Sequence, residues 1–188
     1  MPFENLINRL KLLQLDVTNP NAQKRISTAA AFTVLAQYKR RIFTDGLATD
    51  GSQIGQYSTK PFYQNPNKLT GVAVGGVTPL GKNGLDIFKN GRKKKTRYLS
   101  TGYKELRDLT GRQSDFVDLN FSGSTEGSIQ VGESAGEVVI GFINEKSAEI
   151  MQGQEERFGK EIVAVSDEER EIGFKAARNE LLAIIEEI

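Results

Sequence analysis

The residues best suited to chemistry form a cluster of cations in the middle of the chain. Residues 82–97 contain seven Lys and Arg residues and one acid, Asp86, so this segment carries a net charge of +6. Clustered cations without interleaved aromatic residues suit contact with phosphates, without reading of a base sequence. They suit a solvated hairpin or contact with an acidic protein face equally well. The candidates for such electrostatic contact are Arg92, Lys93, Lys94, Lys95 and Arg97.

The residue types used most often in catalysis are missing or poorly arranged. The chain contains no His and no Cys, which removes the commonest general acid–base group, thiolate chemistry and the usual zinc ligands. Gly71–Gly76 does not fit the spacing of a nucleotide-binding loop. The acids at 155–156 and 167–169 are adjacent in sequence, and adjacent side chains on a helix point apart. We therefore expect no enzyme, with no catalytic residue, no bound metal and no cofactor.

The charge is divided unevenly along the chain. Residues 126–188 contain 15 acids and 6 bases, a net charge of −9, whereas residues 1–125 carry a net charge of +10. Opposite charge in the two halves suits subunits that pack head to tail. Two separately solvated halves would have the same composition, and the sequence leaves both interpretations open.

The spacing of apolar residues predicts two helices in the first quarter of the chain. The first spans Phe3–Leu15, so that residues 1–20 form an N-terminal helix that can serve as an arm. The second spans about 22–44 and ends at Asp45-Gly46. In this second helix we expect one apolar stripe to face the protein, made of Ala29, Phe32, Ala36 and Phe43 with Leu35 and Ile42 beside it. The Lys and Arg residues, Arg41 included, mostly cover the rest of the helix.

Turn-forming residues dominate the next region, and alternating patterns follow it. Residues 46–97 contain many Gly, Pro and Asn-Gly signals and predict an extended loop or arm. A short helix at 103–109, closed by Gly111, precedes predicted strands at 116–121, 128–131 and 137–143. A helix at 147–157 comes next.

The last helix has the clearest start signal in the chain. Ser166 followed three residues later by Glu169 is a capping box. One face of the helix is apolar, and we expect Phe174, Leu181 and Ile185 on that face to contribute to a core or to a subunit contact. The sequence thus predicts a single α+β domain over residues 1–188. This fold has N-terminal helices, an antiparallel sheet with a long basic Gly-rich loop or arm, and a C-terminal helix.

Several short motifs occur in an order that is similar to a known family. They are Asp50-Gly51-Ser52, Tyr57-Ser58, Tyr103–Leu109, Leu119–Gly123, Ser128-Ile129, Val139–Phe142, Ser147-Ala148 and Glu156–Gly159. From about Arg41 to the C-terminus the chain resembles the virion-morphogenesis, or tail-completion, family of the neck of tailed phages. At Glu156-Arg157 the chain departs from the family's His-Gln, and at Tyr57 from its Trp.

The resemblance implies a structural virion protein that joins head and tail by ring assembly. Its partners would be copies of itself, adjoining portal or connector rings, tail-terminator or tail-tube rings, and packaged DNA through non-specific contact. It would be made in the cytoplasm of the host bacterium and located in the neck or tail of the virion. The sequence shows no signal peptide and no run of about 20 apolar residues, so we expect no membrane contact. The alternative is an accessory nucleic-acid-binding module that uses residues 82–97.

Overall fold

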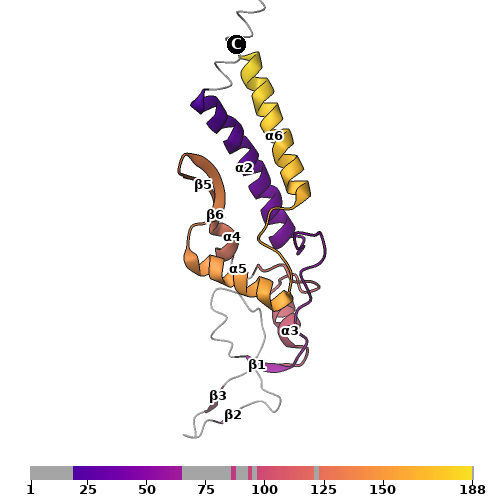
Figure 1. Cartoon of the computed structure of the whole chain (residues 1–188). Helices are drawn as coiled ribbons and strands as arrows, with labels where there is room; N and C mark the ends of the chain where they lie inside the picture. The colour runs from indigo at the N-terminus through magenta and orange to yellow at the C-terminus, as the bar shows by residue number, and fades with distance from the viewer. Residues whose placement is uncertain (1–18, 65–85, 88–92, 95–96, 121–122, 188) are drawn as a thin grey trace, which may run out of the picture. The chain divides into compact units, whose positions relative to one another are not determined.

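The computed structural model describes residues 19–64, 86–87, 93–94, 97–120 and 123–187 (Figure 1). The chain divides into two compact units, one made of residues up to Ser52 and from Leu119 onward, the other of Gln53–Asp118. Helices and small antiparallel sheets make up both the early and the late parts of the described chain, so the predicted α+β class is confirmed. The helix predicted at Phe3–Leu15 lies outside the described residues.

Helix α2, Pro20–Phe43, begins and ends where its sequence signals predict. The Asn19 side chain accepts a hydrogen bond from the Asn21 N–H at 2.9 Å and caps the helix. After the helix ends, Gly46 takes a φ of +65°, a conformation that favours glycine. The predicted face is right at Phe43 and at Leu35 and Ile42 beside it, which are buried, but wrong at Phe32, which is 58% exposed, and at Ala36, which is also exposed. Val34 and Tyr38 are buried in their place.

Helix α6, Asp167–Glu186, packs antiparallel against α2 (Figure 1). The predicted capping box is present, with the Ser166 side chain accepting from the Glu169 N–H and Glu169 accepting from the Ser166 N–H. The two helices approach closely at Gly173, where an added Cβ would lie 2.6 Å from Cγ2 of Val34. A side chain at 173 would therefore force the helices apart.

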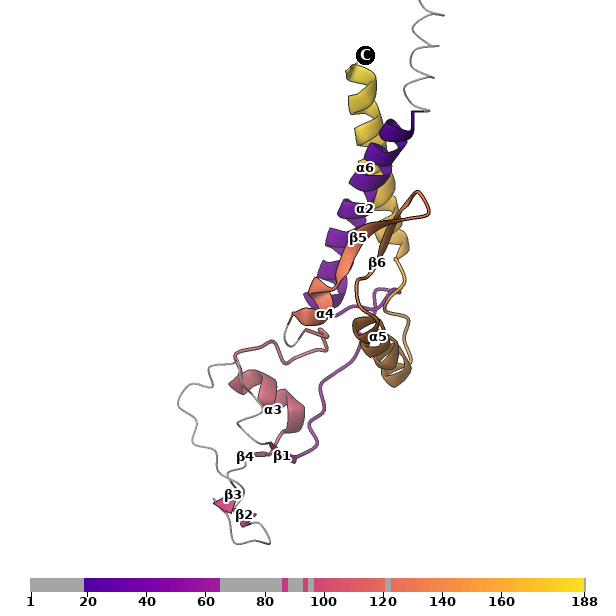
Figure 2. The ribbon, with the colours of Figure 1, turned by 90° about the vertical axis from the view of Figure 1, so that its left-hand side faces the viewer.

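A β-hairpin completes the packing on α2 (Figure 2). Strands β5, Ile129–Ser134, and β6, Glu137–Phe142, pair antiparallel, and both confirm strands predicted from the sequence. Ala135 and Gly136 form the two-residue turn with φ values of 51° and 83°, the pattern of a type I′ hairpin. The short helix α4, Ser124–Gly127, precedes the hairpin.

Helix α5, Glu145–Phe158, follows the hairpin and confirms the helix predicted there. Asn144 caps it by accepting a hydrogen bond from the Ser147 N–H at 2.8 Å. Met151 is buried, and the helix ends at Gly159, whose φ is +62°.

The second unit is built around helix α3, Gly102–Leu109. Strand β1, Phe62–Gln64, pairs antiparallel with β4, Arg97–Leu99, and β2, Asp86–Ile87, pairs with β3, Lys93–Lys94. Gly102 has a φ of +70°, and a Cβ there would lie 2.6 Å from two backbone oxygens, so only glycine fits. The predicted helix is confirmed.

The strand predicted at 116–121 is wrong. Residues 116–120 are not part of any strand, and Leu119 has a positive φ of 49°. Of the loop or arm predicted at 46–97, residues 65–85, 88–92 and 95–96 lie outside the described residues. No helix within the ranges that the structure describes is long and apolar enough to cross a membrane.

Candidate functional site

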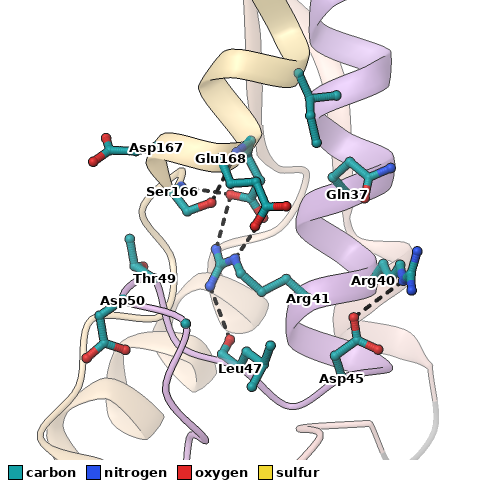
Figure 3. A pocket seen from close by; sticks show the side chains of 13 residues that line it. Gln37, Arg40, Arg41, Asp45, Leu47, Thr49, Asp50, Ser166, Asp167 and Glu168 are labelled. Atoms are coloured by element: carbon teal, nitrogen blue, oxygen red, sulfur yellow. Dashed lines mark hydrogen bonds and ion pairs between the residues drawn. The ribbon is translucent and has the colours of Figure 1, made fainter.

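A cavity of the first unit lies where the C-terminal end of α2 meets the N-terminal end of α6 (Figure 3). Its volume is about 500 Å³. Most of its lining is polar or charged, and comes from the two helix ends and the loop after α2. The charged lining residues are Arg40, Arg41, Asp45, Asp50, Asp167, Glu168 and Glu169.

Arg41 is the central residue of this cavity wall, and it is buried rather than solvated as the sequence pattern predicted. Its Nε donates to Oε1 of Glu169 at 2.7 Å, and its Nη1 donates to the Leu47 carbonyl at 3.2 Å. Its Nη2 donates to the carbonyls of Ile162 and Ala164, at 3.2 and 2.9 Å. All three guanidinium nitrogens are therefore engaged within the protein.

Glu169 connects this arrangement to the start of α6. Its Oε2 accepts the Ser166 N–H at 2.8 Å while its Oε1 accepts from Arg41, and its side chain is only 3% exposed. A charge this deeply buried is stable only when it is paired and hydrogen-bonded. Arg41 and Glu169 together hold the end of α2, the loop at Leu47, the segment at 162–164 and the start of α6; we call this set of contacts the Arg41 joint.

Three other charged groups of the cavity, Arg40, Asp45 and Asp50, also have protein partners. Nε of Arg40 lies 3.4 Å from Oδ2 of Asp45 at the surface. Asp50 accepts hydrogen bonds from both N–H and Oγ of Ser52, and these bonds hold the pKa of Asp50 below its usual range. In the part of the chain that the structure describes, no three acids are grouped so that they would hold a metal ion. The contacts of Arg41 and Glu169 in this cavity wall connect the end of α2 to the start of α6.

Glu155 is another acid whose role the sequence did not reveal. Its Oε1 accepts the N–H groups of Ile162 and Val163, at 2.7 and 2.8 Å. The neighbouring segment is fixed further by the Thr49 N–H, which donates to the Glu161 carbonyl at 2.9 Å. Part of the acidic surplus of the C-terminal half therefore stabilises backbone instead of facing a partner.

A second buried arginine organises the other unit. Nη2 of Arg107 donates to both carboxylate oxygens of Asp118, at 2.9 and 2.7 Å, and both side chains are less than a tenth exposed. Tyr57 donates its hydroxyl to the same carboxylate at 2.7 Å, and the guanidinium lies 4.4 Å from the centre of the Tyr57 ring. Burial and the bond to Asp118 raise the pKa of the Tyr57 phenol. Arg107 and Tyr57 bind the Asp118 side chain, which explains why the predicted strand at 116–121 does not form.

The structure brings the predicted electrostatic residues into short backbone pairings. Lys93 and Lys94 pair with Ile87 and Asp86, and Arg97 begins β4. Their side chains, and the whole of Arg92 and Lys95, lie outside what the structure describes. Contact with DNA or with a partner through these five residues stays a prediction.

The predicted face of α6 is more open than expected. Phe174 is 69% exposed, because the side of α6 that packs on α2 carries Gly173 and Ile184 instead. Leu181 and Ile185 are half-buried. A subunit contact through these residues stays a prediction.

Comparison of the chain with protein-family models, with curated proteins and with solved structures found no match.

Proposed function

We propose that this protein is a structural subunit of a tailed-phage particle that joins head and tail at the neck by assembling into a ring with copies of itself. The order of motifs from Arg41 onward, which resembles the tail-completion family, suggests this particular role. Adjoining portal or connector rings and tail-terminator or tail-tube rings would be its other partners. The virion would be its location, and it would have no catalytic role.

The observation that carries the proposal is the outward position of large apolar side chains on three helices and on the residue that follows β6. Phe32 on α2 is 58% exposed, Ile143 after β6 is 65% exposed, Ile150 on α5 is 43% exposed and Phe174 on α6 is 69% exposed. Exposed aromatic and aliphatic residues on several faces favour contacts with other proteins, although single ones occur on any surface. A ring subunit needs contacting faces on different sides of the molecule, since head-to-tail closure uses two different surfaces.

The buried charges support the same interpretation. Arg41 is paired with Glu169 and Arg107 with Asp118, and both ion pairs are buried and hydrogen-bonded within the protein. A catalytic group is expected to direct at least one polar atom toward a substrate. Described residues with the chemistry for catalysis are thus used to fix the chain, which favours a structural role.

Disruption of the gene in a particle-producing host tests the role directly. We expect DNA-filled heads and complete tails that are not joined, as counted by electron microscopy, with joining restored by the intact chain supplied in trans. Phe32→Ser should fold but fail to restore joining, whereas Ala36→Ser, an exposed position one turn further along α2, should restore it. Normal joining without the gene product would contradict the proposal.

The basic segment offers a second test that separates the ring subunit from an accessory nucleic-acid-binding module. The triple substitution of Lys93, Lys94 and Lys95 by Gln should leave the fold intact, since exposed changes usually stay within about 0.5 kcal/mol. A ring subunit should lose particle joining or DNA retention, and the free chain should bind random duplex DNA weakly. Tight binding by the free chain, falling steeply with salt and abolished in the triple variant, would favour the module instead.

A further inference from the structure

We propose that the outer edge of strand β6 pairs with the same edge of β6 in a second copy of this chain. The two strands run antiparallel, with Ile140 of one copy opposite Ile140 of the other, so that the two hairpins form one continuous sheet. This inference does not depend on the function proposed above. It assigns the region of Ile143 to contact between two copies and leaves Phe32, Ile150 and Phe174 for other partners.

The hydrogen-bonding pattern of the hairpin determines which backbone groups of β6 point outward. The Ile143 N–H donates to the Ser128 carbonyl at 2.8 Å, so these two residues form a hydrogen-bonded pair. Such pairs alternate along an antiparallel ladder with pairs whose backbone groups point away from the partner strand. The two-residue turn at 135–136 fixes the same alternation from the other end. The outward N–H and C=O groups of β6 therefore belong to Val138, Ile140 and Phe142.

These outward groups form an open edge in the part of the fold that the structure describes. Strands β5 and β6 make a two-stranded sheet, and no third strand among the described residues pairs with β6 (Figure 2). Within the described ranges, no backbone hydrogen bond engages the outward groups of Val138, Ile140 or Phe142. A row of unpaired N–H and C=O groups is a template for another strand.

The sequence of β6 lacks the features that usually prevent an edge from pairing. Between Glu137 and Asn144 every residue is apolar or glycine, with no Lys or Pro, and the pairing with β5 contains no bulge. Val139 is 38% exposed and Ile143 is 65% exposed, so part of this apolar run lies in solvent. Every residue of β6 is half-buried or exposed, whereas β5 begins at the buried Ile129. The more accessible edge of the hairpin is thus that of β6.

The β6 edge is complementary to itself when two copies run antiparallel. Hydrogen bonds form only in registers that pair outward residues with outward residues, and the register centred on Ile140 overlaps the whole strand. It places Val138 opposite Phe142 of the second copy, and a β-branched residue opposite an aromatic one favours pairing. The charged residue of β6, Glu137, then lies about 20 Å from its equivalent, because six residues at about 3.4 Å each separate them. Parallel pairing would bring the two carboxylates side by side.

A cysteine introduced on β6 reports contact between copies without background, because the chain has no native Cys. In Ile140→Cys the two thiols lie opposite each other, at a Cα–Cα distance of about 5.5 Å that a disulfide can span. Val131→Cys is the matched control, since Val131 is the hairpin partner of Ile140 and is also half-buried. Each variant is oxidised and analysed by denaturing, non-reducing electrophoresis, with circular dichroism confirming the fold. Disulfide-linked dimers should form about tenfold faster in Ile140→Cys than in the control.

Proline at the same two positions tests the backbone directly. Ile140→Pro removes an outward N–H that the hairpin does not use, so it should keep the fold and abolish pairing between copies. Val131→Pro makes the same change on β5 and should leave that pairing intact. The readout is amide hydrogen exchange at residue resolution. In the unmodified chain and in Val131→Pro, the Val138 and Phe142 amides should exchange about tenfold more slowly at high protein concentration than at low concentration, because only paired copies protect them.

The amides of Val139 and Gly141 point toward β5 and should be protected at every concentration, which provides the internal reference for an intact hairpin. Equal cross-linking rates in the two cysteine variants would overturn the inference. Protection of Val138 and Phe142 that does not change with concentration would mean that the chain covers its own edge, and would overturn it as well. The same conclusion follows if these two amides are unprotected at every concentration, or if Ile140→Pro keeps the concentration-dependent protection.

Discussion

Replacing Arg41 with Met is expected to remove most of the stability of the first unit. Methionine has a similar length and no donor, so it keeps the packing along α2 while deleting every hydrogen bond of the guanidinium. Glu169 would keep only the Ser166 N–H as a donor, and the carbonyls of Leu47, Ile162 and Ala164 would each lose a donor.

The expected cost follows from this inventory. Removing one partner of a buried ion pair costs about 3–5 kcal/mol, because an uncompensated buried charge remains. Whole domains are stable by only about 5–15 kcal/mol, so the substitution should bring the unit close to unfolding. With a urea m-value of about 2 kcal/mol per M, the midpoint of unfolding should fall by about 2 M.

The assay is urea unfolding followed by far-ultraviolet circular dichroism at pH 7, and the neighbouring arginine supplies the control. Arg40 has a side chain that is 68% exposed and pairs with Asp45 only at the surface. Exposed ion pairs contribute at most about 1 kcal/mol, so Arg40→Met should change the midpoint little. Combining Arg41→Met with Glu169→Met removes both charges and should cost less than the sum of the two single changes.

Equal midpoints for Arg41→Met and Arg40→Met would refute the reasoning, because they would show that burial of the guanidinium gives it no special weight. Strict additivity of the two substitutions in the joint would refute the direct pairing of Arg41 with Glu169.

Three further outcomes are expected. Gly173→Ala should lower the free energy of unfolding by about 1–3 kcal/mol, because the added methyl group overpacks against Val34. Urea unfolding should show a smaller loss when Gly173→Ala is combined with Val34→Ala. Ala135→Asn should stabilise the hairpin by about 0.5–1 kcal/mol, since the left-handed conformation disfavours Ala more than Asn; a lower melting temperature would contradict this. Burial raises the pKa of the Tyr38 phenol, so the stability that Tyr38 contributes is complete below about pH 10 and falls above that pH by up to about 1.4 kcal/mol per pH unit. If the free energy of unfolding falls equally steeply at alkaline pH in Tyr38→Phe, this effect is excluded.

Local signals predicted the elements that local chemistry determines. Asn19 with Pro20 starts α2, the capping box of Ser166 and Glu169 starts α6, and the paired runs on either side of Ala135-Gly136 form the hairpin. Each of these features depends on residues within a few positions of one another, so a linear pattern contains the whole cause.

The errors arose where distant residues decide the outcome. Arg41 was expected in water because it belongs to a run of cations, but carbonyls from positions 47, 162 and 164 converge on it in the fold. The alternation around Asp118 predicted a strand, but Arg107 and Tyr57 bind its carboxylate instead. Phe32 follows the helical spacing of its neighbours, yet the buried side of α2 is set by α6 and the hairpin. None of these partners can be read from the local sequence.

The two buried arginines, Arg41 and Arg107, show how charged side chains hold parts of this fold together. Arg41 binds oxygen atoms from the start of α6 and from the segments at 47 and 162–164, and Arg107 binds the Gln113 carbonyl and the Asp118 carboxylate. Both arginines are almost fully buried. A planar guanidinium can bind several oxygens in fixed directions, which a lysine cannot do. The hydrogen bonds described for each guanidinium are directed at oxygen atoms within the protein. Among the described residues, Phe32 and Ile143 present large apolar side chains to solvent, and contact with another protein at these positions would bury apolar area.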